Sequence, residues 1–185
     1  MSTKDLVLVA LFAALIAVLG IFPAITIPVL LVPITAQTLG VMLAGSLLGA
    51  TRGGLAVLVF LILVAVGLPL LAGGRGGLGV FGGPSAGFLI AWPVAAFVIG
   101  WLTERAWTRY GLVTALGINL FGGIVLIYVP GIVWLAAGGL GFGQATALSS
   151  AFVPGDVLKA VLASLVSVTL RRYRQHPIAE KRAKA

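Results

Sequence analysis

The chain has 185 residues, of which 61% are hydrophobic and only 9% charged, and its mean hydropathy is +1.20. A soluble domain carries roughly 25% charged residues, so this composition excludes a water-facing surface over most of the molecule and indicates an all-α, polytopic membrane protein. The net charge of +8 would suggest nucleic acid in a soluble protein, but the charges lie at the ends of apolar segments, so membrane topology explains them and no nucleic-acid partner is expected.

Six apolar segments have roughly the length that a membrane-spanning helix needs, about 20 residues. In chain order they are Leu6–Phe22, Thr35–Ala50, Gly54–Leu71, Ser85–Leu102, Leu112–Ala136 and Gly155–Leu170. No polar linker divides them. The sequence therefore predicts one six-helix membrane domain, residues 1–172, and a basic cytoplasmic tail, residues 173–185.

Small residues recur at a spacing of four in the first two segments. Ala10-x-x-x-Ala14 and Ala13-x-x-x-Ala17 lie in the first, and Gly45-x-x-x-Gly49 lies in the second. Small residues let the backbones of neighbouring membrane helices approach closely. Such stripes pack inside the molecule in most cases, and docking of a partner helix is the alternative.

The basic residues fix the expected orientation. With the N-terminus in the cytoplasm, ten of the 12 Lys and Arg residues fall on the inner side, and only Arg75 and Lys159 fall on the outer side. Because Lys and Arg are enriched in cytoplasmic loops, both termini are predicted to be cytoplasmic. Among the four acidic residues, Asp156 alone then lies on the outer side.

Two of these outer charges share the start of the last segment. Asp156 and Lys159 are three residues apart, so they lie on one face of a helix whose first turn favours an acidic residue. One interpretation is a local ion pair that helps the helix end sit at the membrane interface. The other is a polar ligand site, because charges at membrane depth are costly and mark function by default.

A glycine-rich loop, residues 73–85, joins the third and fourth segments and carries Arg75. Its G-x-G-x-x-G spacing does not indicate a dinucleotide site, because that motif needs a preceding strand within a βαβ unit. The loop is either a flexible connector or a segment folded over a binding cavity, where Arg75 could offer a guanidinium to a carboxylate. Gln37, near the outer start of the second segment, is expected either to touch a ligand or to bind backbone groups.

The sequence lacks the residue sets that common catalytic sites require. It has no cysteine, no P-loop, no H-E-x-x-H motif and a single histidine, His176, which lies in the tail. An enzyme, a metal centre and an intrinsic ATPase are therefore not expected. The residues favour a small membrane protein that binds a solute on its outer side and depends on partners for energy.

Three motifs in order resemble the BioY family, and the resemblance spans about residues 5–172. The first is Pro33-Ile34-Thr35-Ala36-Gln37-Thr38-Leu39-Gly40 followed by residues 45–53. The second runs from Gly67-Leu68-Pro69 through residues 74–79 and includes Gly83-Pro84. The third is Val153-Pro154-Gly155-Asp156-Val157-Leu158-Lys159. The chain departs from the family at Ser85-Ala86, where Thr-Gly is commoner.

The resemblance implies a biotin-binding S component of an energy-coupling factor (ECF) transporter, in the cytoplasmic membrane of a prokaryote. It implies a transmembrane T component and ABC-type ATPases as partners. Contacts to biotin would come from Asp156 and Lys159, then from Arg75 and Gln37. The T component would face the small residues of the first helix, namely Ala10, Ala14, Ala13 and Ala17.

Biotin offers two ureido N–H donors, one ureido carbonyl and a carboxylate, which suits one acidic and two basic side chains. Whether Lys159 or Arg75 meets the carboxylate stays open at this stage. The alternatives are an S component for another vitamin and a structural or channel-forming membrane subunit.

Overall fold

The computed structural model describes residues 1–22, 32 and 35–183, with side chains described as far as Arg171. The helices are α1 Thr3–Leu19, α2 Gln37–Leu48, α3 Ala50–Ala65, α4 Ala86–Arg105, α5 Leu112–Leu120, α6 Leu126–Leu135, α7 Phe142–Ser150 and α8 Val153–Ala183. The predicted all-α fold is confirmed. The side chains of residues 172–185, which include most of the predicted basic tail, lie outside the described residues, and α8 continues through residue 172 without a break.

Each predicted segment coincides with a helix, but the helices differ in length. Three helical stretches, Ala86–Arg105, Leu112–Leu140 and Val153–Arg171, are long and apolar enough to cross a membrane. The apolar helices α2 and α3 are shorter, and α1 has 17 residues. The count of six crossings and the cytoplasmic placement of both termini stay predictions.

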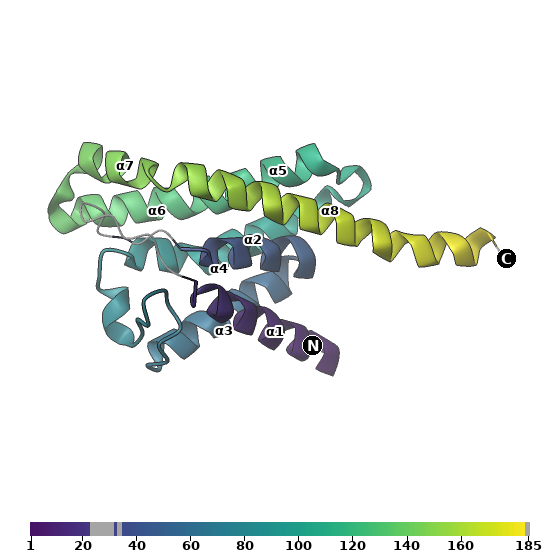
Figure 1. The fold of residues 1–185 in the computed structure, drawn as a ribbon, viewed down its shortest axis with the longest axis horizontal. Helices are drawn as coiled ribbons and strands as arrows, with labels where there is room; N and C mark the ends of the chain where they lie inside the picture. The colour runs from purple at the N-terminus through teal and green to yellow at the C-terminus, as the bar shows by residue number, and fades with distance from the viewer. Residues whose placement is uncertain (23–31, 33–34, 184–185) are drawn as a thin grey trace.

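Helix α4 lies at the centre of the bundle and packs against α2, α3 and α6. Helix α8 packs across α2 and α5, while α1 packs against α3 and α2. Figure 1 shows the resulting arrangement: α2 and α4 form a middle layer, with α5 to α8 on one side of it and α1 and α3 on the other. The first turn of α8 is thereby placed beside the beginning of α2.

Glycines allow the backbone of α4 to approach the backbones of α2 and α3 closely. A Cβ at Gly45 of α2 would lie 2.6 Å from the Ala96 carbonyl oxygen, and a Cβ at Gly100 would lie 2.3 Å from the Ala50 nitrogen. Contacts this short against backbone cannot be relieved by a side-chain movement. The small-residue stripe of the second segment is therefore used for internal packing.

Apart from α8, which runs beyond the predicted end at Leu170, the structure differs from the predicted segments in three places. Helix α3 ends at Ala65 instead of Leu71, because Gly67 has a φ of 114° and Pro69 follows it. The fifth segment is interrupted by π-helical turns at Phe121–Val125 and Ala136–Leu140 on either side of α6. Helix α7 lies between the fifth and sixth predicted segments, where the sequence predicted no helix.

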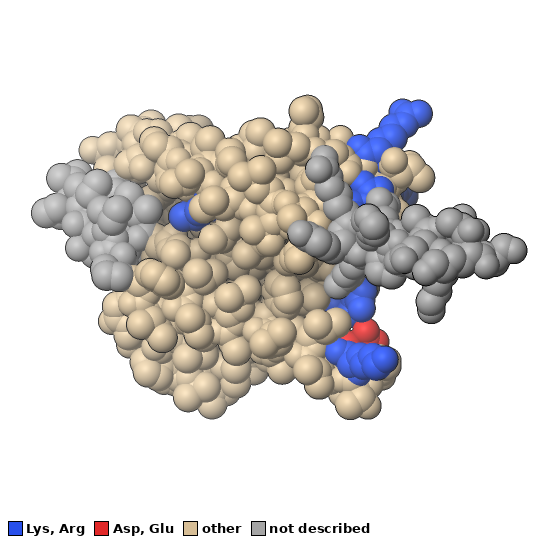
Figure 2. Space-filling view, turned by 45° about the vertical axis from the view of Figure 1, so that its right-hand side comes forward, with Lys and Arg blue, Asp and Glu red and all other residues tan. Residues whose placement is uncertain are grey.

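Charged residues gather at the end of the bundle opposite the first turn of α8. Arg52 of α3 bonds Asp5 of α1 at 3.1 Å, which joins two helix starts there. Arg171 of α8 donates to the carbonyl groups of Trp107 and Tyr110 in the α4–α5 connection. Figure 2 shows most of the visible Lys, Arg and acidic residues clustered at one end of a largely uncharged surface, with a small basic patch near the other end.

Candidate functional site

The first turn of α8 brings Asp156 and Lys159 into a largely buried ion pair. Lys159 Nζ lies 2.8 Å from Asp156 Oδ1, and the side chains are 14% and 5% exposed respectively. Helix spacing of three residues places both on one face, and the packing of α8 against α2 turns that face inward. The pair therefore faces the protein interior and not the surrounding lipid.

Two hydroxyl groups from other helices complete this ion pair. Thr38 of α2 donates to Asp156 Oδ1 at 2.9 Å and accepts from Lys159 Nζ at 3.0 Å. Tyr128 of α6 donates to Asp156 Oδ2 at 2.5 Å. Buried charges are tolerated where such hydrogen bonds satisfy them, so α2, α6 and α8 together stabilise the pair.

Thr38 and Tyr128 were not among the predicted site residues. Thr38 directly follows Gln37 in the first motif, and its uncharged hydroxyl gave no sequence signal of a role in binding. Tyr128 offers a clearer signal, because it lies within an apolar span, whereas tyrosines of membrane helices gather at the interfaces. A phenol within a span needs a hydrogen-bond partner, and here the partner is Asp156.

The network leaves some hydrogen-bonding capacity unused. An ammonium group has three N–H donors, and Lys159 uses two of them on described residues. Each carboxylate oxygen can accept about two bonds, and Asp156 Oδ2 accepts one. The pair can therefore offer a ligand one donor and one acceptor without losing its internal bonds.

Arg75 lies in the loop between α3 and α4 and also borders the cavity. Its Nε donates to the Ala72 carbonyl at 3.2 Å, and the described residues provide no other acceptor for its guanidinium. Burial lowers the pKa of Arg75, because desolvation disfavours the charged form. A carboxylate placed beside this group would offset that desolvation.

Gln37 is buried at the first residue of α2, where its amide binds backbone groups. Its Nε2 donates to the carbonyls of Ile16 at 3.2 Å and Leu70 at 3.1 Å. Its Oε1 accepts from the Ala72 nitrogen at 3.1 Å. Gln37 also borders the cavity. Of the two roles expected for it, contact with a ligand and binding to backbone groups, the structure shows the second.

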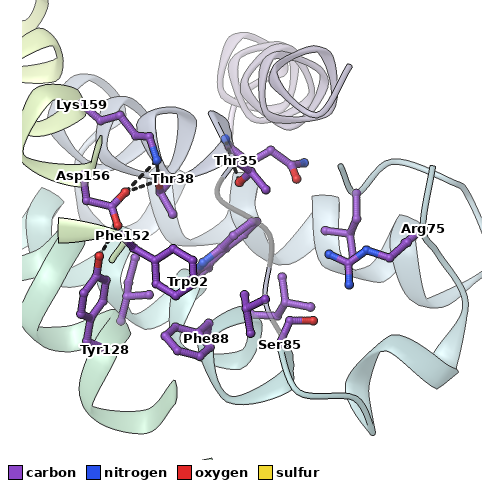
Figure 3. A pocket seen from close by; sticks show the side chains of 15 residues that line it. Thr35, Thr38, Arg75, Ser85, Phe88, Trp92, Tyr128, Phe152, Asp156 and Lys159 are labelled. Atoms are coloured by element: carbon purple, nitrogen blue, oxygen red, sulfur yellow. Dashed lines mark hydrogen bonds and ion pairs between the residues drawn. The ribbon is translucent and has the colours of Figure 1, made fainter. Parts of the chain in front are cut away.

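A cavity connects these groups, with an empty volume of about 560 Å³ including its open mouth. Figure 3 shows the ion pair with Thr38 on one side, Arg75 on the opposite side and aromatic rings between them. The aromatic lining residues are Phe88, Trp92, Tyr128 and Phe152.

The aromatic wall also contains an unsatisfied donor. Trp92 is 5% exposed, and its indole N–H has no acceptor among the residues that the structure describes. Its ring stacks on Phe60 with centroids 6.2 Å apart. The cavity thus has a neutral, hydrogen-bonding end, an apolar middle and a cationic end, which suits a ligand with a polar ring and an anionic tail.

The four alanines predicted to meet a partner do not share one environment. Ala10 and Ala14 lie on the exposed face of α1. Ala13 is 4% exposed and packs in the core, and Ala17 is partly buried. An exposed stripe on α1 can therefore include Ala10 and Ala14, whereas Ala13 faces the bundle.

Comparison with known proteins identifies the family. A model of the BioY family matches residues 1–176. The biotin transporter BioY of Rhizobium etli is 55% identical over 172 residues, which cover 90% of this chain and 92% of that protein. The biotin transporter BioY of Rhodobacter capsulatus is 49% identical over 182 residues, with 92% and 95% covered.

A solved structure agrees with these matches. The crystal structure of the S-component for biotin from an ECF-type ABC transporter superposes with a TM-score of 0.87 at 35% identity, covering 93% of this chain and 95% of the other. The family match extends over nearly the whole chain, and the bundle reproduces that of the solved protein. This chain belongs to the BioY family.

Proposed function

We propose that the protein captures biotin in the cavity between α2, α4, α6 and α8 and passes it to the cytoplasm with an ATP-driven ECF module. The relatives from Rhizobium etli and Rhodobacter capsulatus are biotin transporters, and the superposed structure is an S-component for biotin. The family consists of transport proteins and not enzymes. The observation that carries the proposal is the cavity itself, with polar groups at two ends and aromatic side chains between them.

The charge distribution favours one orientation of the ligand. Asp156 and Lys159 neutralise each other, so the spare donor and acceptor at that end suit a neutral group that both donates and accepts, as a ureido ring does. Arg75 has no acidic partner among the described residues, so the cationic end suits the carboxylate. The reverse orientation would place a carboxylate beside Asp156, where like charges repel.

The partners and the location follow from the family. We propose that the cavity opens to the outer face of the cytoplasmic membrane of a prokaryote, because Arg75, Asp156 and Lys159 are the charges that the positive-inside rule leaves outside. A transmembrane T component would contact the exposed face of α1 at Ala10 and Ala14, and ABC-type ATPases would supply the energy. The surrounding lipid bilayer covers the remaining apolar faces.

Calorimetry on the purified protein in detergent tests the proposal. Wild-type protein should bind biotin, and Asp156→Asn and Lys159→Met should each lower the affinity at least about tenfold, because each leaves a buried polar partner unsatisfied. Glu104→Gln is the matched control, since Glu104 lies at the end of α4 away from the cavity and accepts from the Ala50 nitrogen. Its affinity should equal that of wild type.

Two results would contradict the proposal. Binding of another vitamin in place of biotin, seen in competition with labelled biotin, would change the ligand while keeping the transporter class. Full tolerance of Asp156→Asn and Lys159→Met, together with solute flux that does not saturate, would support a structural or channel-forming subunit.

A further inference from the structure

Gln37 connects three parts of the chain around the cationic end of the cavity. We infer that Gln37 is a positioning residue for Arg75, which acts through the turn Leu71–Arg75 and thereby sets the affinity for the anionic group of the ligand. The inference rests on the proposed function, since it assigns the carboxylate to Arg75. It gives Gln37 a role distinct from contact with the ligand.

The hydrogen bonds of Gln37 leave it no donor for an anion. A carboxamide has two N–H donors, and both are used, on Ile16 of α1 and on Leu70. Its oxygen already accepts from Ala72, and an oxygen cannot bind a carboxylate. Gln37 is 1% exposed, so its three bonds are made where water does not compete.

Ala72 connects Gln37 to Arg75, because its backbone forms a hydrogen bond with each side chain. The Ala72 N–H donates to Gln37 Oε1 at 3.1 Å, and the Ala72 carbonyl accepts from Arg75 Nε at 3.2 Å. One residue of backbone therefore separates the carboxamide from the guanidinium. With Nε occupied in this way, the two Nη groups are the part of Arg75 left to meet a ligand.

The turn between these groups is compact. The Leu71 nitrogen donates to the Arg75 carbonyl at 3.0 Å, and the Gly74 nitrogen donates to the Leu71 carbonyl at 2.9 Å. Gly73 and Gly74 have φ values of 78° and 70°, which glycine adopts readily and other residues do not. Because Leu71 and Ala72 are 2% and 1% exposed, the turn is anchored in the interior and does not move as a free loop.

The outer end of α1 supports the same anchor. A Cβ at Gly20 would lie 2.5 Å from the Leu70 carbonyl oxygen and 2.9 Å from Gln37 Nε2. The absence of a side chain at Gly20 thus lets α1, α2 and the turn meet at the carboxamide. A binding group held in place before the ligand arrives loses less entropy on binding, which raises affinity.

The first experiment compares two ligands that differ only in the tail. Biotinamide keeps the ureido ring and replaces the carboxylate by a neutral amide. Wild type should bind biotin more tightly than biotinamide. Gln37→Met should weaken biotin binding about tenfold while changing biotinamide binding less than about twofold. Arg75→Gln should remove the preference for biotin over biotinamide. The double variant should be no worse than Arg75→Gln alone, because both act on one interaction. Gln144→Met on the exposed face of α7 is the matched control.

A second variant reaches the same turn without touching α2. Gly74→Ala strains the turn through its φ of 70°, while the added Cβ meets no atom within 4 Å. It should reproduce the selective loss of biotin over biotinamide. Gly141→Ala is its control, because Gly141 has a similar φ of 74°, an equally open surrounding and a place far from Arg75 in the chain.

The outcomes separate this inference from the proposed function. If Gln37→Met and Gly74→Ala weaken both ligands equally, or neither, Gln37 does not act through Arg75 and the inference is wrong, although biotin still binds. If wild type binds neither ligand, the proposed function fails first. Should Gln37→Met not fold, the Gly74→Ala comparison decides alone.

Discussion

At the scale of single residues, Thr38 holds the ion pair of the cavity in one geometry. Its hydroxyl donates to Asp156 and accepts from Lys159, so it uses both of its functions within the same pair. Tyr128 fixes the other carboxylate oxygen. These contacts leave the spare donor of Lys159 and the spare acceptor of Asp156 in defined directions, as the proposed selection of a ureido group requires.

Replacing Thr38 tests whether this hydroxyl matters for binding. Thr38→Val keeps the shape but removes the bridge, so biotin affinity should fall about tenfold by calorimetry, as expected for a hydrogen bond to a charged group. Thr38→Ser keeps the hydroxyl and should stay close to wild type. Equal affinity in all three proteins would show that Lys159 and Asp156 keep their positions without α2.

The sequence predicted the charged site residues for a physical reason. Charges are scarce in this chain, and three of them are predicted to fall on the outer side, so Asp156, Lys159 and Arg75 are conspicuous. The structure places all three around one cavity. The backbone partners of Gln37 could not be predicted, because they come from Ile16, Leu70 and Ala72, and any carbonyl or N–H is equally suitable in the sequence.

At the scale of elements, α1 has two distinct faces. Val9, Ala13 and Ile16 are buried against the bundle, whereas Val7, Leu11 and Val18 are more than half exposed. Ala10 and Ala14 lie among these exposed side chains. A second helix can approach the backbone of α1 closely only beside the two alanines.

A bulky residue on this face should separate binding from transport. Ala14→Trp should leave biotin affinity in detergent unchanged, because Ala14 does not border the cavity, but should lower ATP-dependent uptake in cells several-fold by obstructing the T component. Ala147→Trp on the exposed face of α7 is the control. If Ala14→Trp leaves uptake unchanged, or if it still co-purifies with the T component as the control does, the partner contacts another helix.

The helices were predictable to different degrees. Runs of apolar residues located all six segments, since lipid demands backbone bonds within each segment. The π-helical turn before α6 was not predictable, because Gly122 and Gly123 in this turn pack against Ile99 and Met42, which come from other helices. Helix α7 was missed because it is too short and too polar to register as a span.

At the scale of the whole molecule, the charges divide the protein into two unlike ends. The Arg52–Asp5 pair and the contacts of Arg171 lie at one end. The cavity with Arg75 and the Asp156–Lys159 pair occupies the other. This separation is what the positive-inside rule requires of a protein with both termini in the cytoplasm.

The absence of cysteine makes the orientation directly measurable. Leu78 is 75% exposed in the loop before α4, and Thr108 is exposed in the connection after it. In intact cells a membrane-impermeant maleimide should label Leu78→Cys at once and Thr108→Cys only after the membrane is permeabilised. The reverse pattern would invert the predicted topology and place the cavity on the cytoplasmic side.

The mutual neutralisation of Asp156 and Lys159 also bears on folding. Because each charge has partners within the chain, α2, α6 and α8 can pack around the pair without a counterion.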